Sequence, residues 1–536
     1  MPTHWCVRLI SLLALVAATA PAQVVVLTPT STVFNPAGGT MVFNASVSYS
    51  TPPSVLAFSA TIPSGWSHVS TGTGPSVVPA AGATGTLDWI YVSAPPSPFT
   101  FNFTVQYPAN VSGAQPLTST TITRDATGSP SVSNPGPGVT LTVPSNTAVW
   151  DGTTGNWTDA ARWSGSTVPA NGAATTYAAR VTAGTVTSNA PVTVNDLQFI
   201  GGTINNLSTL TLAGSGSIWE AGIFTGVGQL VINSNAFLTA ATANNHDFAQ
   251  TAITNQGQFI WNGSGSLRSG NGGSFLNASG ATFTDATSGA VQITNSTIGG
   301  NFTFTNAGTY LKTGSTQTTV SVPFVNQGSI IANAGTLQFA NTFTQSQSTG
   351  NILLAPGATA RFDQGLNLAA GNLTGSGTVV GNVTNAAFIS PGSILGQLTI
   401  QGNLSLAAGS VLQFDIGGTT QGTTYDFLNV TGTAQLAGTL TINLVNGAQS
   451  TILPTNSFTL LNASSITGSF SNVTNGARIF ATNGVSSFVV SYTPTSLVLS
   501  SFNPIPEPST WALLATGLAA VAVSIRHRRR GTCSKR

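Results

Sequence analysis

Charged residues are scarce in this chain of 536 residues, where they make up 5% of the sequence. An ordinary soluble domain contains about 25% charged residues. Nucleic-acid binders need clustered Lys and Arg to neutralise phosphates, and the sequence has no such cluster before residue 526. Chains that are disordered because of their composition have few apolar residues, whereas hydrophobic residues make up 41% of this one. The composition therefore excludes nucleic-acid binders and charged, disordered tail proteins.

Cysteine and histidine are also scarce. Cys6 and Cys533 are the two cysteines, so the chain between them can form no disulfide and no thiolate metal site. Between residues 23 and 503 the histidines are His68 and His246, which lack the spacing of a zinc site. No Gly-rich loop precedes a Lys-Ser/Thr pair, as phosphate binding would require. We therefore expect no cofactor and no metal ion.

The first 22 residues have the organisation of a secretory signal peptide. Arg8 precedes an apolar run at residues 9–18, and Ala20 and Ala22 place small residues where signal peptidase probes the chain. The run is too short to cross a bilayer core of about 30 Å. We expect export across the inner membrane and cleavage by signal peptidase after Ala22.

The segment 503–536 combines a proline-rich stretch, an apolar run at residues 511–525 and a basic tail. The prolines favour an extended backbone. The apolar run predicts a single transmembrane helix in the precursor, and the basic tail would stay in the cytoplasm by the positive-inside rule. At the two ends of the chain the predicted sorting and processing residues are Ala20, Ala22, Pro506, Glu507, Pro508, Trp511, Arg526, Arg528, Arg529 and Arg530.

This arrangement resembles the PEP-CTERM sorting signal, in which a Pro-Glu-Pro triplet, a helix and a basic tail follow in this order. The resemblance implies that an exosortase-type enzyme cuts near Glu507 and releases a transiently anchored protein to the cell surface or the extracellular matrix. The alternative is a plain tail anchor that keeps the protein in the membrane.

Residues 23–143 predict one Ig-like β-sandwich. Apolar side chains alternate with polar ones at Phe101, Phe103, Val105 and Tyr107, and Pro- and Gly-rich clusters separate the short runs. Trp66 and Trp89 are expected in the core or at its rim, and stacking on a sugar is the alternative.

Residues 144–389 predict a right-handed parallel β-helix, or solenoid. Its opening contains Trp150, Trp157 and Trp163 and resembles the start of autotransporter-like β-strand repeat regions. We interpret the three indoles as a cap over the exposed first coil, since terminal repeats are atypical for this reason. Carbohydrate binding is the alternative.

Similar phrases recur behind this cap, each with an Asn shortly before a Gly. The Asn positions are 255, 277, 306 and 326. Both residue types tolerate the left-handed region and favour tight turns. A turn every twenty-odd residues is typical of a parallel β-helix with about three short strands per coil, and the Asn side chains could stack into a hydrogen-bonded ladder.

Residues 390–502 keep the alternation and resemble the final coils of an autotransporter passenger. The resemblance rests on residues 390–404, which include Ser390-Pro391-Gly392, and on the stretch from Tyr425 to Gly432. Passengers normally precede a membrane β-barrel. Because a sorting signal follows here instead, we expect no self-translocation by that route.

The sequence offers few candidates for catalysis. His246 and Asp247 are adjacent, which suits a polar loop better than a catalytic triad, because neighbouring strand residues face opposite sides. Glycosidases need two carboxylates about 5–10 Å apart. The nearest pairs in sequence are Asp151 with Asp159 and Asp415 with Asp426. No segment gathers the base and acidic cluster of a polysaccharide lyase.

We therefore predict an exported, non-enzymatic structural or adhesive protein of the surface or extracellular matrix that associates with extracellular polysaccharide. Two alternatives stay open. One is a β-helix lyase or hydrolase that degrades polysaccharide, and the other is a permanently membrane-anchored attachment protein. Two carboxylates converging in a cleft would favour the enzyme.

Overall fold

The structure, a computed structural model, describes residues 23–29, 38–49, 53–108, 115–124, 132–136, 138–141, 145–172, 175–295, 299–484, 486–504 and 521. The chain divides into two compact units. Unit 1 comprises residues 1–144 with 172–176, and unit 2 comprises residues 145–171 with 177–536. The described elements are β-strands and three short 3-10 helices, which confirms the all-β prediction for this part of the chain.

Unit 1 contains two antiparallel sheets that enclose one apolar core. The first sheet has the order β1 (Gln23–Pro29), β2 (Gly39–Tyr49), β6 (Phe99–Tyr107) and β4 (Ser67–Thr71). The second has the order β5 (Thr86–Tyr91), β3 (Val55–Thr61), β7 (Gln115–Arg124) and β8 (Val132–Pro135), and β9 (Val139–Leu141) pairs with β7.

The side chains of β6 alternate between buried and more exposed positions, as the sequence predicts. Phe101, Phe103 and Val105 are buried, while the residues between them face outward. Trp89 packs 4.4 Å from Phe103, measured between ring centroids, and Trp66 is fully buried. Both tryptophans are therefore core residues, and neither offers an indole face to a sugar.

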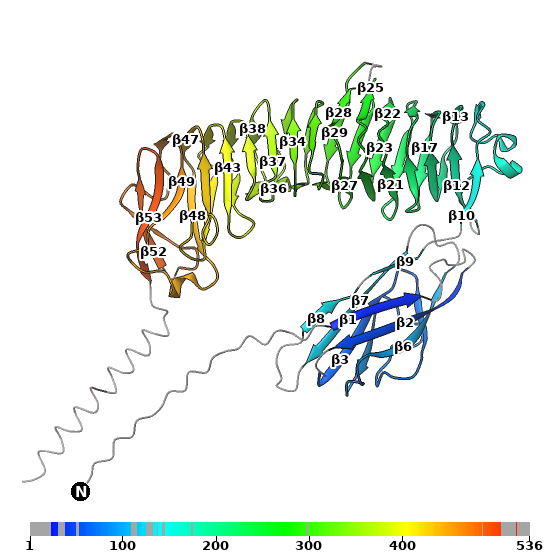
Figure 1. The fold of residues 1–536 in the computed structure, drawn as a ribbon, viewed down its shortest axis with the longest axis horizontal. Coiled ribbons are helices and arrows are strands. Elements are labelled where there is room, and N and C mark those ends of the chain that lie inside the picture. The colour runs from blue at the N-terminus through cyan, green and yellow to red at the C-terminus, as the bar shows by residue number, and fades with distance from the viewer. Residues whose placement is uncertain are drawn as a thin grey trace, which may run out of the picture. The chain divides into compact units, whose positions relative to one another are not determined.

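Unit 2 is a parallel β-helix in which strands of successive coils stack in long sheets (Figure 1). The 14-stranded sheet consists of β10 (Ser145–Val149), β12 (Thr176–Val181), β15 (Asp196–Phe199), β18 (Ser217–Trp219), β21 (Phe237–Ala240), β24 (Gln258–Trp261), β27 (Thr282–Asp285), β30 (Thr309–Lys312), β33 (Ser329–Ala332), β36 (Asn351–Leu354), β39 (Asn372–Gly375), β42 (Phe388–Pro391), β45 (Val411–Ile416) and β48 (Thr439–Leu444).

The 17-stranded sheet consists of β11 (Thr154–Asn156), β13 (Thr185–Ser188), β16 (Thr203–Asn206), β19 (Ile223–Thr225), β22 (His246–Ala249), β25 (Leu267–Gly270), β28 (Val291–Asn295), β31 (Gln317–Val320), β34 (Thr336–Phe339), β37 (Thr359–Phe362), β40 (Thr378–Val380), β43 (Gln397–Gln401), β46 (Phe427–Val430), β49 (Phe458–Asn462), β51 (Arg478–Phe480), β52 (Ser486–Tyr492) and β53 (Ser496–Pro504). Its last two strand pairs, β51 with β52 and β52 with β53, are antiparallel.

The third side of the coil is built from two sheets. The 8-stranded sheet consists of β14 (Val192–Val194), β17 (Thr209–Leu212), β20 (Gln229–Ile232), β23 (Ala252–Asn255), β26 (Ser274–Asn277), β29 (Thr303–Asn306), β32 (Phe324–Asn326) and β35 (Phe343–Thr344). The 5-stranded sheet consists of β38 (Leu366–Leu368), β41 (Val383–Asn385), β44 (Leu404–Leu406), β47 (Thr433–Leu436) and β50 (Ser465–Gly468). In the described structure, β35 and β38 belong to different sheets. One isolated β-bridge, from Gln345 to Leu368, connects the two sheets at this point.

Most coils therefore contribute three short strands, as the repeat spacing predicts. The strands alternate buried and partly exposed side chains, as in the Thr-Leu-Thr-Leu sequence of β17, and the buried ones form one continuous core. Aromatic rings stack in register inside the coils: Phe275 lies 4.7 Å from Phe304, and Phe304 lies 5.0 Å from Phe324, between ring centroids. Burial of this continuous core is the main stabilising contribution in the solenoid, whose residues include no cysteine that could form a disulfide.

The first coil carries the three tryptophans and the 3-10 helices η1 (Ala160–Arg162) and η2 (Ser164–Ser166); a third, η3 (Ala448–Ser450), follows β48. Trp150, Trp157 and Trp163 are all buried, with Trp163 5.0 Å from each of the other two ring centroids. Their position supports the interpretation as a cap, because all three close the apolar interior of the coil.

The 14-stranded sheet runs through β42, which includes residue 390, where the sequence suggests a change of region. The predicted C-terminal transmembrane helix lies outside the described residues apart from Val521. Among the residues that are described, no helix is long and apolar enough to cross a membrane.

Candidate functional site

The predicted sorting and processing residues at both chain ends lie outside the described residues. Their roles rest on the sequence, and the structure places none of them. The candidate groups that it does place are the carboxylates, the histidines, and the polar residues of the repeated turns.

The carboxylates of Asp151 and Asp159 both face the guanidinium of Arg162. Arg162 contacts Asp151 at 3.3 Å and Asp159 at 3.4 Å. Asp151 also accepts hydrogen bonds from the hydroxyl and backbone N–H of Thr153, and these bonds lower the pKa of the Asp151 carboxyl. The pair therefore tightens the turn beside the tryptophan cap.

His246 and Asp247 lie in strand β22, so the expectation of a polar loop is wrong. Strand geometry sends their side chains to opposite faces. His246 is fully buried, with Nε2 2.8 Å from the Trp219 carbonyl oxygen, and burial lowers its pKa. Asp247 instead faces outward and accepts two hydrogen bonds, both 2.7 Å long, from Arg268 on the next coil. The adjacent pair therefore forms no catalytic dyad.

Asp415 and Asp426 are brought together at the start and end of a loop. Asp426 is fully buried and uses both carboxylate oxygens: Oδ1 accepts the Gly396 N–H at 2.9 Å, and Oδ2 accepts the Asp415 N–H at 2.8 Å. Burial raises the pKa of Asp426 to about 8. The Asp415 carboxylate accepts amide hydrogens from Asn443 and Gln413. Because backbone amides occupy both carboxyl oxygens of Asp426, this side chain holds the loop in place.

Metal ligands do not cluster in the part of the chain that the structure describes. His68, for example, is buried in unit 1, with its ring nitrogens 2.8 Å from the Thr71 hydroxyl and 3.1 Å from the Ala80 carbonyl oxygen.

The recurring asparagines form a continuous ladder inside the solenoid. Asn255 donates to Asn277 at 2.8 Å, Asn277 to Asn306 at 2.7 Å, and Asn306 to Asn326 at 2.9 Å. Asn326 then donates to Gln345 at 2.7 Å. We call these five residues the amide ladder. Its first four members were expected from the sequence, and all five are buried.

Gln345 was missed because it is not an asparagine. A signal was present, since Phe343-Thr344-Gln345 repeats the pattern of residues 304–306 with one longer amide. The ladder matters for the surface above it, because Asn277 and Asn306 also bond to the backbone just past the turn of the next coil. The second amide hydrogen of Asn277 goes to the Thr309 carbonyl oxygen at 3.0 Å, and that of Asn306 to the Ser329 carbonyl oxygen at 2.9 Å.

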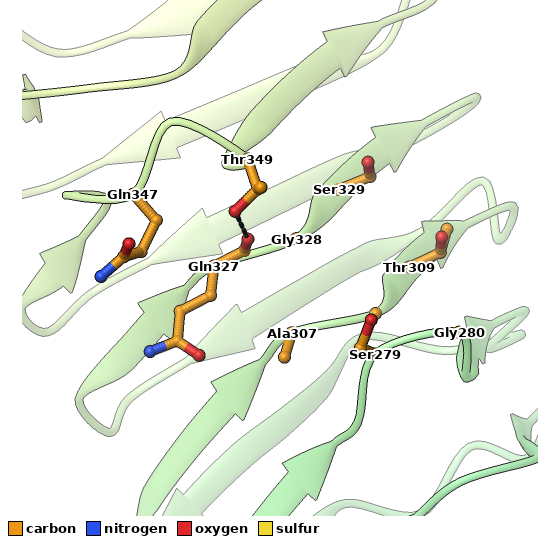
Figure 2. Close-up of a pocket in the computed structure, with 10 residues that line it drawn as sticks. Ser279, Gly280, Ala307, Thr309, Gln327, Gly328, Ser329, Gln347 and Thr349 are labelled. Atoms are coloured by element: carbon orange, nitrogen blue, oxygen red, sulfur yellow. Dashed lines mark hydrogen bonds between the residues drawn. The ribbon is translucent and has the colours of Figure 1, made fainter.

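The turns fixed in this way line a shallow groove with a volume of about 550 Å³. It is formed by Ser279, Gly280, Ala307, Gly308, Thr309, Gln327, Gly328, Ser329, Gln347 and Thr349. No charged side chain is among them. Figure 2 shows the Gln327 and Gln347 amides projecting to the same side of the turns, with the Thr349 hydroxyl donating to the Gln327 carbonyl oxygen at 2.6 Å. Hydroxyl and amide groups thus recur coil after coil across a neutral surface.

Residues 504–530 match the PEP-CTERM protein-sorting motif, which confirms the recognition made from the Pro-Glu-Pro segment. No curated protein matches the chain. Among solved structures, the chain is similar to AggA, the major subunit of aggregative adherence fimbriae type I from Escherichia coli, with 14% sequence identity and a TM-score of 0.17. That similarity covers 23% of this chain and 96% of the other. The sorting motif marks an exported protein that exosortase-type machinery processes.

Proposed function

We propose that the exported protein is a non-enzymatic structural or adhesive component of the cell surface or extracellular matrix that associates with neutral polysaccharide. The observation that carries the proposal is the uncharged groove above the amide ladder. Sugars present hydroxyl groups that both donate and accept hydrogen bonds, and the amides and hydroxyls of this groove do the same.

The repetition of the groove residues suits a polymer better than a single sugar. Gln327 and Gln347 are exposed and lie on turns of successive coils, so that one polysaccharide chain could contact several turns. Each contact would be weak, because water competes for it. Linked contacts raise the overall affinity, since every further contact is intramolecular.

The absence of charge supports a neutral polymer over an acidic one. An anionic polysaccharide would need Lys or Arg near its carboxylate or sulfate groups, and none lines the groove. The Arg268 guanidinium lies in strand β25 and is paired with Asp247.

The arrangement of the carboxylates supports a non-enzymatic role. Hydrolysis of a glycoside needs two carboxylates that face the substrate. Asp426 instead accepts two backbone amides, and Asp151 is bound to Thr153 and Arg162. We expect Asn at position 151, 247, 415 or 426 to leave the biological activity of the protein in place. A rate loss of about 10² or more at one position, without unfolding, would indicate acid–base catalysis and overturn the proposal.

Binding of the purified protein to an array of neutral and acidic polysaccharides tests the function. We expect binding to neutral polymers that persists at high salt, because no charge is involved. The double variant Gln327→Ala with Gln347→Ala should weaken binding at least severalfold. The matched control is Gln317→Ala, which removes an exposed glutamine outside the groove. Equal loss in the control, or unchanged binding in the double variant, would place the interaction elsewhere.

A further inference from the structure

Lys312 and Asp285 lie opposite each other on adjacent coils, deep inside the solenoid. They are register partners in strands β30 and β27, and both side chains have an exposed fraction of 0%. The Lys312 Nζ lies 3.4 Å from Asp285 Oδ1. The pair therefore joins two coils at a position that solvent does not reach.

The pair has poor geometry for an ion pair. A good hydrogen bond between ammonium and carboxylate is about 2.7–2.9 Å long, and an ammonium has three hydrogens to donate. Among the described residues, Nζ makes one hydrogen bond, which is the contact with Asp285. Removing both charges from water costs several kcal/mol per ion, which only excellent geometry offsets. By contrast, the outward-facing pair of Arg268 and Asp247 forms two hydrogen bonds of 2.7 Å. The same fold can therefore hold an ion pair in good geometry.

Burial therefore favours the neutral amine form of the Lys312 side chain. It lowers the pKa of Lys312, and transfer of one proton from the ammonium to the carboxylate removes both charges. The products are a free amine and a carboxylic acid, held at contact distance by two hydrogen-bonded strands. These are the two reactants of amide formation.

We propose that Lys312 and Asp285 condense into an intramolecular isopeptide bond. The Lys312 Nζ lone pair attacks Cγ of the Asp285 carboxylic acid and forms the N–C bond. The nitrogen then gives a proton to the departing hydroxyl, the C–O bond breaks, and one water molecule leaves. No oxidant, reductant or cofactor is needed, since the carbon keeps its oxidation state.

Two hydroxyl groups stand where they would assist this step. Tyr310 donates to Asp285 Oδ2 at 2.9 Å, and Thr287 donates to Oδ1 at 2.9 Å. One carboxyl oxygen leaves as water, and the other carries the negative charge that grows as the amine attacks. The hydroxyl on the second oxygen would stabilise this charge, and the hydroxyl on the first would hold the departing oxygen in place. Burial raises the pKa of Tyr310 far above its usual range, so its hydroxyl keeps the proton that it donates. We assign these residues a positioning role.

Tryptic digestion with mass spectrometry tests the proposal on the full-length protein. Trypsin cleaves after Arg268, Lys312 and Arg361. An isopeptide bond would block cleavage after Lys312 and keep Asp285 and Lys312 in one peptide. We therefore expect a peptide of residues 269–361 whose mass is one water molecule below the mass calculated from its sequence. Normal cleavage after Lys312 with no loss of mass would overturn the proposal. Loss of water with normal cleavage would indicate a succinimide at an aspartate and would also overturn it.

Three variants sharpen the test. Lys312→Met and Asp285→Ala should abolish the mass loss, and Tyr310→Phe should lower the fraction of linked protein severalfold. Asp247→Asn is the matched control, because it breaks the outward pair at a similar place in the fold, and it should leave the linked peptide unchanged. If the core variants fail to fold, the digest of the unsubstituted protein still decides the question.

Discussion

Asp426 and Asp415 are joined by two reciprocal hydrogen bonds that close a loop between strands β45 and β46. The backbone N–H of Asp426 donates to the Asp415 carbonyl oxygen at 2.9 Å, and the Asp415 N–H donates to Oδ2 of Asp426 at 2.8 Å. The carboxyl group of Asp426 therefore replaces a strand partner at a point where the chain leaves the regular coil.

This loop should make stability depend on pH. Burial raises the pKa of Asp426 from 3.8 to about 8. Between these values the folded protein binds a proton that the unfolded chain releases, so the free energy of unfolding falls as pH rises and levels off above pH 8. The contribution of one such group is at most about 1.4 kcal/mol per pH unit.

Urea unfolding followed by circular dichroism between pH 4 and pH 9 measures this dependence. Asp426→Asn should flatten the curve, because the amide cannot ionise. Asp415 has a pKa raised in the same direction by burial, so part of the slope should remain. A variant whose curve parallels the unsubstituted protein would show that Asp426 does not titrate in this range.

The amide ladder should be sensitive to loss of one rung. Asn306→Ala removes the acceptor of Asn277 and the donor to Asn326, which leaves buried amides without partners. We expect the free energy of unfolding to fall by roughly 2–4 kcal/mol. The exposed control Gln317→Ala should change it by about 0.5 kcal/mol or less. Equal effects of the two substitutions would mean that the ladder adds no stability.

The tryptophan cap should contribute to folding and not to sugar binding. Trp157 is fully buried, its indole N–H donates to the Pro169 carbonyl oxygen at 3.0 Å, and its own carbonyl oxygen accepts the Trp163 indole N–H at 2.8 Å. Trp157→Ala should lower stability by about 3–5 kcal/mol, whereas Val227→Ala, at a side chain 76% exposed, should have little effect. Polysaccharide binding by the folded fraction should stay the same. A selective loss of binding would restore the carbohydrate interpretation of the indoles.

The sorting segment should control release of the protein from the inner membrane. Glu507→Ala, or deletion of Pro506–Pro508, should trap the full-length protein in the inner membrane, because exosortase-type processing near the triplet would fail. Neutral residues at 526, 528, 529 and 530 should instead weaken retention and orientation. Cell fractionation with a C-terminal immunoblot separates these outcomes. An intact basic tail on protein outside the cell would leave a simple anchor as the explanation.

The parts of the fold that depend on period and repetition could be predicted from the sequence. Alternation identified β6 and the coil strands, and four asparagines identified one edge of every coil in their region. The alternation also indicates which side chains are buried: Tyr310 and Lys312 are two residues apart in β30, so both face inward. A lone Lys suggests a surface residue, which hid the buried pair.

Contacts between individual side chains of neighbouring coils could not be predicted in the same way. Asp285 and Lys312 meet because their strands are in register, and this register depends on turn lengths that vary along the chain. Similarly, the loop closed by Asp415 and Asp426 interrupts the repeat, and nothing in the repeat specifies the hydrogen bonds that a departure from it will form.

The interruption of the third side of the solenoid has a mechanical consequence. Hydrogen bonds between coils run along the solenoid axis. Tension applied at the two ends of the solenoid therefore acts on every junction between coils, and at each junction the strand pairs of the three sides share the force. Where β35 gives way to β38, one isolated bridge replaces a strand pair, and fewer bonds share the force. Under tension along the axis, rupture should begin at this coil, and the two halves of the solenoid should separate before either of them unravels.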